Sequence, residues 1–156
     1  MFSEKDREWM LLALDEARAA LRRREVPVGA VVISGDRLLG RGHNQTESLN
    51  DPTAHAEIIA LGAAAATTGS WRLEGASLYV TVEPCVMCAG AALNARVGRI
   101  VYGTAEPKTG ACGSLIDLFP LLRRRADIVV ERGLLAEDAT RLLKTFFELL
   151  RGQPPA

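Results

Sequence analysis

Four side chains suited to metal binding and proton transfer stand in two short segments of the sequence. His55 and Glu57 are two positions apart, while Cys85 and Cys88 follow Pro84 at a spacing of three. Imidazole and thiolate both bind Zn²⁺ readily, and three protein ligands leave the fourth tetrahedral position open to water. An open position indicates a catalytic metal, and the Glu57 carboxylate is the predicted catalytic group because it can carry protons. The sequence therefore predicts a zinc ion held by His55, Cys85 and Cys88.

The chemistry expected of these residues is the hydrolytic deamination of a nucleobase. Coordination to zinc lowers the pKa of water to about 7, which makes hydroxide available at neutral pH. Glu57 would take a proton from this water and pass it to a ring nitrogen of the base. The hydroxide would attack the amine-bearing carbon, and Glu57 would then protonate the departing ammonia. The order H-x-E followed by P-C-x-x-C is the signature of zinc-dependent base deaminases.

The elements around these residues must bring them to one point. On a helix Cys85 and Cys88 lie on the same side, and Pro84 predicts that they occupy its first turn, where unpaired amides and the helix dipole favour thiolate. On a regular helix His55 and Glu57 would point to opposite sides. We therefore expect His55 at the very start of its helix, directly after a proline-containing segment.

Two other functions fit part of this pattern. A strand leading into Cys-x-x-Cys at a helix start is also typical of thiol–disulfide oxidoreductases, but that function leaves His55 and Glu57 without a role and lacks an early βαβ unit. A non-catalytic zinc-stabilised binding module would need the metal ligands but not Glu57. His43 could be a fourth ligand of a closed structural site, and Cys112 is expected to be a small buried or loop residue outside the site.

The composition indicates an ordinary globular domain without a global preference for nucleic acid. The chain has 156 residues, of which 48% are hydrophobic and 24% charged, and its formal net charge is zero. Contact with nucleic acid would depend on local patches such as Arg22–Arg24 or Arg123–Arg125, which can equally be solvated ends of elements. An odd number of cysteines fits a reducing compartment, and neither a signal peptide nor a membrane span is recognisable. We expect a cytoplasmic protein.

Hydrophobic periodicity and turn residues divide the chain into helices and strands. The predicted helices have apolar residues three and four apart and cover residues 4–23, a segment from 53 or 54 to 69, a segment from 84 to before 98, and a last segment containing 139–150. The predicted strands are short apolar runs at 28–33, 38–42, 78–82, 99–102 and 127–131. Residues 103–125 are expected to be loop, with one helical turn around 114–119.

This order of elements predicts an α/β protein with three layers. A central mixed sheet of five strands would carry helices on both faces, with an antiparallel hairpin first and parallel strands after the helical crossovers. We expect a single zinc-dependent deaminase domain over residues 1–152 and a C-terminal tail over residues 153–156.

Nearly the whole chain resembles the bacterial tRNA-specific adenosine deaminases, which convert wobble adenosine to inosine and belong to the cytidine/deoxycytidylate deaminase superfamily. The matching motifs are longer than the zinc signature and comprise Glu25–Ala30, Asn44, Asp51–Glu57, Leu78–Gly90, Lys108–Gly110, Gly113–Leu115 and Phe146–Phe147. The resemblance implies a three-layer α/β/α cytidine-deaminase-like fold and one zinc ion per subunit. It also implies a homodimer in which both subunits touch RNA.

The resemblance assigns three residues to the pocket for the target base. Asn44 matches an amide that contacts the purine edge, a use that suits a side chain with both a donor and an acceptor. From the sequence alone, Asn44 is equally well explained as a turn residue after a strand. Val28 and the backbone of Ala56 match the walls of the pocket.

Three further residues match positions that meet the rest of the RNA. Glu106 and Lys108 fall in a loop that in relatives meets the nucleotides beside the target, and many relatives carry aspartate where Glu106 stands. Phe147 matches an aromatic residue on the last helix that reaches the RNA, although its spacing fits core packing equally well.

The expected substrate is a tRNA anticodon loop, because its splayed bases can leave the stack and reach the metal. The resemblance implies wobble adenosine, typically in an arginine tRNA. Free nucleobase or nucleoside deaminases of the guanine or cytidine type share the zinc signature and are the alternative.

Overall fold

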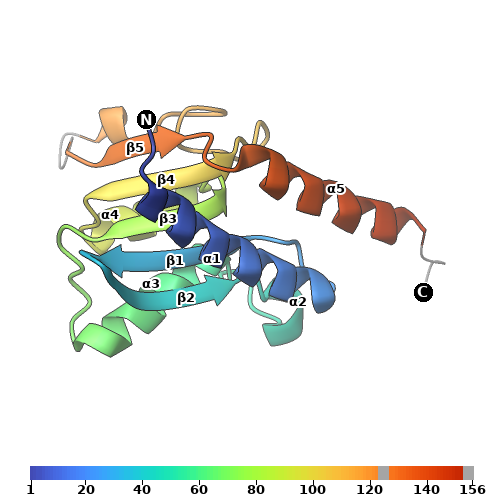
Figure 1. The fold of residues 1–156 in the computed structure, drawn as a ribbon, viewed down its shortest axis with the longest axis horizontal. Coiled ribbons are helices and arrows are strands. Elements are labelled where there is room, and N and C mark those ends of the chain that lie inside the picture. Colours follow the sequence, from blue (N-terminus) through green and yellow to red (C-terminus); the bar gives the residue numbers. More distant parts are fainter. Residues whose placement is uncertain (123–126, 153–156) are drawn as a thin grey trace.

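One mixed sheet runs through the middle of the molecule in a computed structural model that describes residues 1–122 and 127–152 (Figure 1). Its five strands lie in the spatial order β2 (Arg37–His43), β1 (Gly29–Ser34), β3 (Ser77–Val82), β4 (Arg99–Thr104) and β5 (Val129–Arg132). β1 is antiparallel to both β2 and β3, whereas β3, β4 and β5 are parallel to one another. The predicted hairpin and the predicted parallel strands are confirmed.

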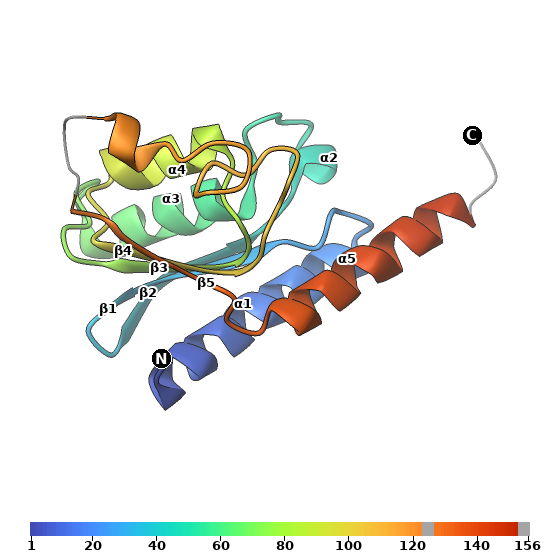
Figure 2. The same cartoon turned by 90° about the horizontal axis from the view of Figure 1, so that it is seen from above.

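Helices cover both faces of the sheet, so the three predicted layers are confirmed (Figure 2). α1 (Glu4–Arg22) and α5 (Ala136–Arg151) lie on one face, and α3 (Ala56–Thr68) and α4 (Val86–Asn94) lie on the other. α5 extends past the edge of the sheet, and its C-terminal part stands away from the body (Figure 1). None of the described helices is both long enough and apolar enough to cross a membrane.

The core consists of two apolar clusters, one on each face of the sheet. Side chains of a strand alternate between its faces. In β1, Val32 therefore packs in the cluster with α3 and α4, while its neighbours Val31 and Ile33 pack in the cluster with α1. Leu78 and Tyr79 of β3 divide between the two clusters in the same way. The same alternation determines which side chains of each strand point toward α3 and α4.

Close contact between α3 and β2 depends on glycine. A Cβ atom on Gly40 would lie 2.5 Å from both the backbone oxygen of Ala60 and the backbone nitrogen of Ala64. The helix can approach the sheet this closely only because Gly40 has no side chain. Small residues on the facing side of α3, among them Ala60 and Ala64, are fully buried.

A buried carboxylate joins the start of α1 to the sheet. Asp6 forms a capping pair with Ser3, since each side chain accepts a hydrogen bond from the other residue's backbone N–H. The Asp6 carboxylate also accepts from the Tyr79 hydroxyl at 2.6 Å and from the Arg99 guanidinium at 2.7 Å. The hydrogen bond from Arg99 holds the pKa of Asp6 well below its usual range.

Three local predictions were wrong. A short helix, α2 (Thr46–Leu49), follows β2 and was not expected. α3 begins at Ala56 rather than at 53 or 54, because the Asp51 side chain accepts from the backbone and hydroxyl of Thr53 and holds these residues in a turn. The helical turn expected at 114–119 lies instead at Phe119–Leu121, where a proline stands in its first turn.

The remaining element boundaries shift by a few residues at most. α4 begins at Val86 rather than at 84, so the prediction that Cys85 lies in its first turn was wrong: Cys85 has an extended backbone and forms the N-cap of the helix. Arg123–Arg125, named above as a possible patch for nucleic acid, and the predicted tail at 153–156 lie outside the described residues.

Candidate active site

Two helix N-termini bring the three predicted metal ligands together. His55 is the N-cap residue of α3, as its spacing from Glu57 required, and Cys85 is the N-cap residue of α4. Cys88 stands in the first turn of α4 and is fully buried. His55 Nδ1 lies 3.7 Å from Cys85 Sγ and 3.4 Å from Cys88 Sγ, and all three atoms lie within 4.8 Å of one another.

These distances suit a tetrahedral zinc ion. Zn–N bonds of about 2.0–2.1 Å and Zn–S bonds of about 2.3 Å at tetrahedral angles separate the nitrogen and sulfur ligand atoms by about 3.5 Å. The two observed nitrogen–sulfur distances, 3.7 Å and 3.4 Å, bracket this value. The donor set of one imidazole and two thiols also matches what zinc prefers, so the residues fit the ion.

The protonation of the two thiols follows from their contact. The Cys88 thiol donates to Cys85, and this hydrogen bond, with help from His55, lowers the pKa of Cys85 to about 4. The same hydrogen bond and burial raise the pKa of Cys88 above its ordinary value. Contact with Cys85 raises the pKa of His55. A cation at the centre of the group would oppose the shift at Cys88, because coordination deprotonates a thiol.

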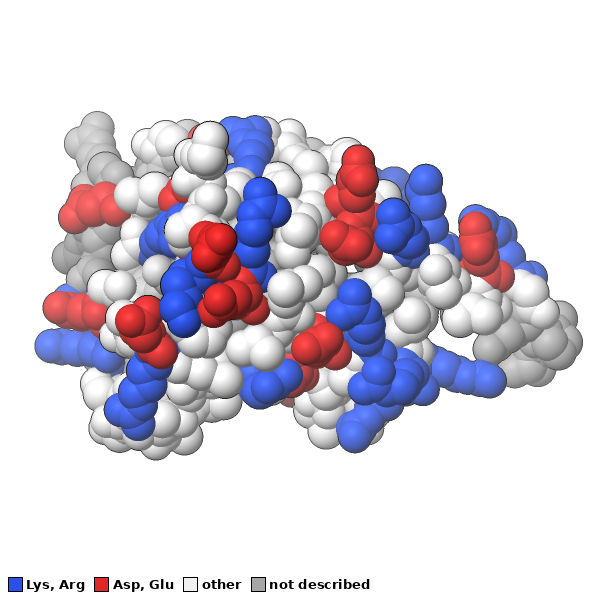
Figure 3. Space-filling view, in the orientation of Figure 1, with Lys and Arg blue, Asp and Glu red and all other residues white. Residues whose placement is uncertain are grey.

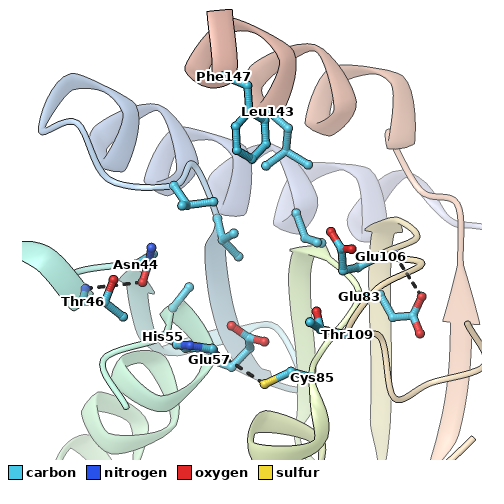
Figure 4. A pocket seen from close by; sticks show the side chains of 14 residues that line it. Asn44, Thr46, His55, Glu57, Glu83, Cys85, Glu106, Thr109, Leu143 and Phe147 are labelled. Atoms are coloured by element: carbon cyan, nitrogen blue, oxygen red, sulfur yellow. Dashed lines mark hydrogen bonds between the residues drawn. The ribbon is translucent and has the colours of Figure 1, made fainter. Parts of the chain in front are cut away.

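Glu57 supplies a buried carboxyl group beside the cluster. It stands in the first turn of α3, two residues after His55, and is only 4% exposed. Burial disfavours the charged form and raises its pKa to about 7. Figure 4 shows Glu57 between His55 and Cys85, with its carboxyl group directed toward the cavity above them.

A cavity of about 300 Å³ opens over this group. Its walls come from six separate segments of the sequence and comprise Val26, Val28, Asn44, Thr46, His55, Ala56, Glu57, Val82, Glu83, Cys85, Glu106, Thr109, Leu143 and Phe147 (Figure 4). The structure thus brings together most of the residues that were predicted to bind substrate, namely Val28, Asn44, Ala56, Glu106 and Phe147. Their roles remain predictions.

Lys108 is the one predicted substrate residue that the cavity does not include. Its side chain is exposed, and its backbone N–H donates to the Glu106 carboxylate at 3.0 Å. The loop therefore turns Glu106 toward the cavity and leaves Lys108 at the surface. A role for Lys108 would require substrate that extends beyond the cavity.

Asn44 is held at the end of β2 beside the cavity. It is 7% exposed, its backbone N–H donates to Val28 at 3.1 Å, and its side-chain oxygen accepts from the backbone of Thr46 at 3.4 Å. The short helix α2 that follows is anchored by Glu25, whose buried carboxylate accepts from the N–H groups of Glu47 and Ser48 at 3.2 and 2.6 Å.

Several wall residues were not found from the sequence. Leu143 stands four residues before Phe147 on α5, and Figure 4 shows both side chains reaching over the cavity. Their helical spacing was available as a signal, because residues four apart share a helix face. The branched residues Val26 and Val82 and the loop residue Thr109 carried no such signal.

Two residues considered in the sequence lie outside the metal group. His43 Nδ1 lies 2.8 Å from the Glu16 carboxylate, so its side chain is engaged on the α1 side of the hairpin. Cys112 is buried, as expected, and burial raises the pKa of its thiol to about 12.

Comparison with known proteins identifies the class. A family model described as MafB19-like deaminase matches residues 4–151, which is nearly the whole chain. The fold, the His–Cys–Cys group and the adjacent carboxyl group together define a deaminase.

Individual relatives narrow this class. A tRNA-specific adenosine deaminase of Haemophilus influenzae is 44% identical over 150 residues, which are 96% of this chain and 87% of the relative. A structure solved in a study of A-to-I editing by tRNA:A34 deaminases at the wobble position has a TM-score of 0.81 and 43% identity, covering 87% of this chain and 99% of that one. A guanine deaminase of Nitrosomonas europaea is more distant, with a TM-score of 0.79 and 25% identity over 94% of this chain and 85% of that one. The chain belongs to the family of tRNA-specific adenosine deaminases and is an enzyme of that kind.

Proposed function

We propose that this enzyme converts adenosine to inosine at the wobble position of a tRNA anticodon, by adding water and releasing ammonia. One observation carries the proposal: a buried carboxyl group, Glu57, and a group of three metal-binding side chains share the floor of a cavity of about 300 Å³. The names of the relatives at 43–44% identity supply the substrate class.

We assign His55, Cys85 and Cys88 as the ligands of one zinc ion per chain. When bound, zinc supplies Lewis acidity that lowers the pKa of water to about 7. His55 and Cys85 hold their side chains toward the group as N-cap residues, and Cys88 closes it from the buried side.

We assign Glu57 as the carrier of both protons. Its carboxyl group is shielded from solvent and is close enough to the cavity floor to take a proton from attacking water. The same carboxyl group would pass that proton to a ring nitrogen of adenine. It would later take the second proton from the hydroxyl on the attacked carbon and give it to the leaving amine, which departs as ammonia. A group with a pKa near neutrality performs both transfers well.

The cavity walls suit a purine that has left its stack. Val28 provides apolar surface, the backbone of Ala56 forms another part of the wall, and the Asn44 side chain offers both a donor and an acceptor to the edge of the base. Leu143 and Phe147 of α5 cover the cavity from the opposite side (Figure 4). An aromatic ring in this position can stack on a base.

The surface around the cavity offers local positive charge despite the zero net charge. Arg22–Arg24 are exposed at the end of α1 and directly precede Glu25 and the wall residue Val26. In Figure 3, lysine and arginine side chains are numerous toward the end of the molecule where α1 and α5 finish, with acidic side chains between them. Cations there can pair with phosphates of a bound RNA.

An arginine tRNA as substrate and a homodimer remain expectations from the sequence resemblance, and a cytoplasmic location remains an expectation from the sequence composition. Glu106 and Lys108 are proposed to contact nucleotides beside the target, and Phe147 is proposed to contact the RNA from α5.

The alternative is a deaminase of free bases, since a guanine deaminase shares the fold at 25% identity.

The test is to incubate the purified protein with an anticodon stem-loop carrying wobble adenosine, and separately with free adenosine, cytidine and guanine. We expect inosine from the stem-loop and no ammonia from the small substrates. Ammonia only from a small substrate would overturn the tRNA assignment.

A further inference from the structure

Glu83 is a buried acidic residue for which the proposed chemistry has no use. It follows β3 directly and precedes Pro84 and Cys85, and it is 4% exposed. Among the described residues, no lysine, arginine or histidine forms an ion pair with it. A buried carboxylate without a cation needs several hydrogen-bond donors to offset its desolvation.

Those donors all come from one loop. Glu83 Oε1 accepts from the backbone N–H of Glu106 at 3.2 Å and from the Ser114 hydroxyl. Glu83 Oε2 accepts from the backbone N–H groups of Cys112 and Ser114 at 3.0 and 3.1 Å. One carboxylate thus binds both ends of the segment 106–114.

This segment is the loop that carries Glu106 and Thr109 into the cavity wall and presents Lys108 beside it. Other contacts close the loop on itself and onto the strand end. The Gly110 N–H donates to the Glu106 carbonyl at 2.8 Å, and the Ala111 N–H donates to the Pro84 carbonyl at 2.8 Å.

The packing around the carboxylate leaves no spare room. A Cβ atom on Gly110 would lie 2.3 Å from Glu83 Oε2 and 2.5 Å from the Glu106 carbonyl oxygen. Gly110 also forms an isolated bridge with Cys85. The glycine therefore lets the loop backbone rest directly on Glu83.

We propose that Glu83 is a positioning residue that sets the affinity for the RNA substrate by fixing the shape of the loop 106–114. Although Glu83 borders the cavity, both its oxygens are occupied by loop donors, so it acts through Glu106 and Thr109 rather than on the reacting atoms. The inference rests on the proposed function, because it takes RNA as the ligand that the loop meets.

Glu83→Gln is the sharpest perturbation, since the amide keeps the size of the side chain. Backbone N–H groups contact both oxygens, so in either orientation the new NH₂ group faces at least one N–H donor. The variant therefore loses acceptors and gains a donor–donor conflict at one end of the loop.

We expect RNA affinity to fall by at least about tenfold, because one hydrogen bond to a charged acceptor is worth about that much. Binding of a labelled anticodon stem-loop is measured by fluorescence anisotropy in a Glu57→Gln background, where turnover does not interfere. With Glu57 present, KM should rise by a similar factor while kcat stays within about threefold. Hydrogen exchange of the amides at 106–114 should become faster.

Two variants control for general loss of stability. Asp6→Asn alters another buried carboxylate, which binds Tyr79 and Arg99 away from the cavity, and should leave RNA affinity unchanged. Ser114→Ala removes one of the four hydrogen bonds at an exposed residue and should weaken binding less than Glu83→Gln. If Glu83→Gln does not fold, the same measurements of RNA affinity and hydrogen exchange on Ser114→Ala test the inference.

Unchanged RNA affinity and unchanged loop exchange in both Glu83→Gln and Ser114→Ala would overturn the inference. A fall in kcat that follows a matching loss of bound zinc would also overturn it, because Glu83 would then act on the metal group through Cys85. If the unaltered enzyme makes no inosine from the stem-loop, the proposed function fails. Hydrogen exchange would still show whether Glu83 holds the loop.

Discussion

Replacement of Glu57 by Gln should separate proton transfer from the other properties of the site. The amide has nearly the same shape as the carboxyl group, and the position is 4% exposed, so the first turn of α3 should pack unchanged. Glu57 is not a member of the His–Cys–Cys group, so its loss should not release the metal. One positioned acid or base contributes about 10²–10⁴-fold to a rate, and here one carboxyl group serves two transfers.

We therefore expect kcat to fall by at least about 10³-fold, a barrier increase of about 4 kcal/mol. Single-turnover conversion of the stem-loop adenosine to inosine measures the rate, and elemental analysis and fluorescence anisotropy measure zinc content and RNA affinity. Glu74→Gln is the matched control, since that residue is exposed and, among the residues that the structure describes, forms an ion pair with Arg96 alone. A variant that keeps its rate within tenfold, or that loses zinc and activity together, would refute the role of Glu57 as proton carrier.

Three further changes test the fold and the metal group. Asp6→Asn should lower the free energy of unfolding at pH 7 by about 2–4 kcal/mol, because it removes the buried carboxylate from a partly buried ion pair with Arg99. The pKa of Asp6 in the folded protein lies below its ordinary 3.8, so the stabilisation by Asp6 is complete above about pH 4 and is lost as the pH falls further. Below about pH 4, the stability measured by urea unfolding should therefore depend less on pH in the variant than in the unaltered protein. Removal of zinc by a chelator should lower Tm by several degrees and abolish turnover, with both restored by added Zn²⁺; an unchanged Tm would contradict binding at the His–Cys–Cys group. Gly40→Ala should destabilise the protein by about 1–3 kcal/mol in denaturant titrations, because its Cβ would meet α3 at 2.5 Å, whereas Gly62→Ala on the same helix meets open space and should be tolerated.

The placement of the metal group could be predicted because chemistry restricted it. Cys85 and Cys88 can bind one ion only if both side chains lie on the same side of a helix. His55 can bind the same ion, with Glu57 nearby, only if His55 lies at the start of its helix. Both conditions hold at the N-termini of α3 and α4. The three layers were predictable for a similar reason, since the periodicity of apolar residues reflects burial on a face.

The cavity walls were less predictable, because distant contacts shape them. α2 is too short to show periodicity, and it is held by Glu25, a residue 22 positions before Glu47. The orientation of the loop at 106–114 depends on Glu83, which is 23 residues before Glu106. Hydrophobic patterns carry no information about such side-chain to backbone contacts, so the outward position of Lys108 was not apparent.

The arrangement divides chemistry and recognition between different parts of the fold. The candidate metal ligands and Glu57 stand on the N-termini of two helices that pack on the sheet, so their positions follow from the core. The proposed recognition residues stand on β-strand ends, two anchored loops and the projecting helix α5, where change disturbs the core less. Enzymes with this fold can therefore keep one reaction and differ in substrate, as the shared fold of a guanine deaminase indicates. It follows that substrate choice must be tested at Asn44, the loop at 106–114 and α5, because exchange of the proposed metal ligands should abolish the reaction for every base alike.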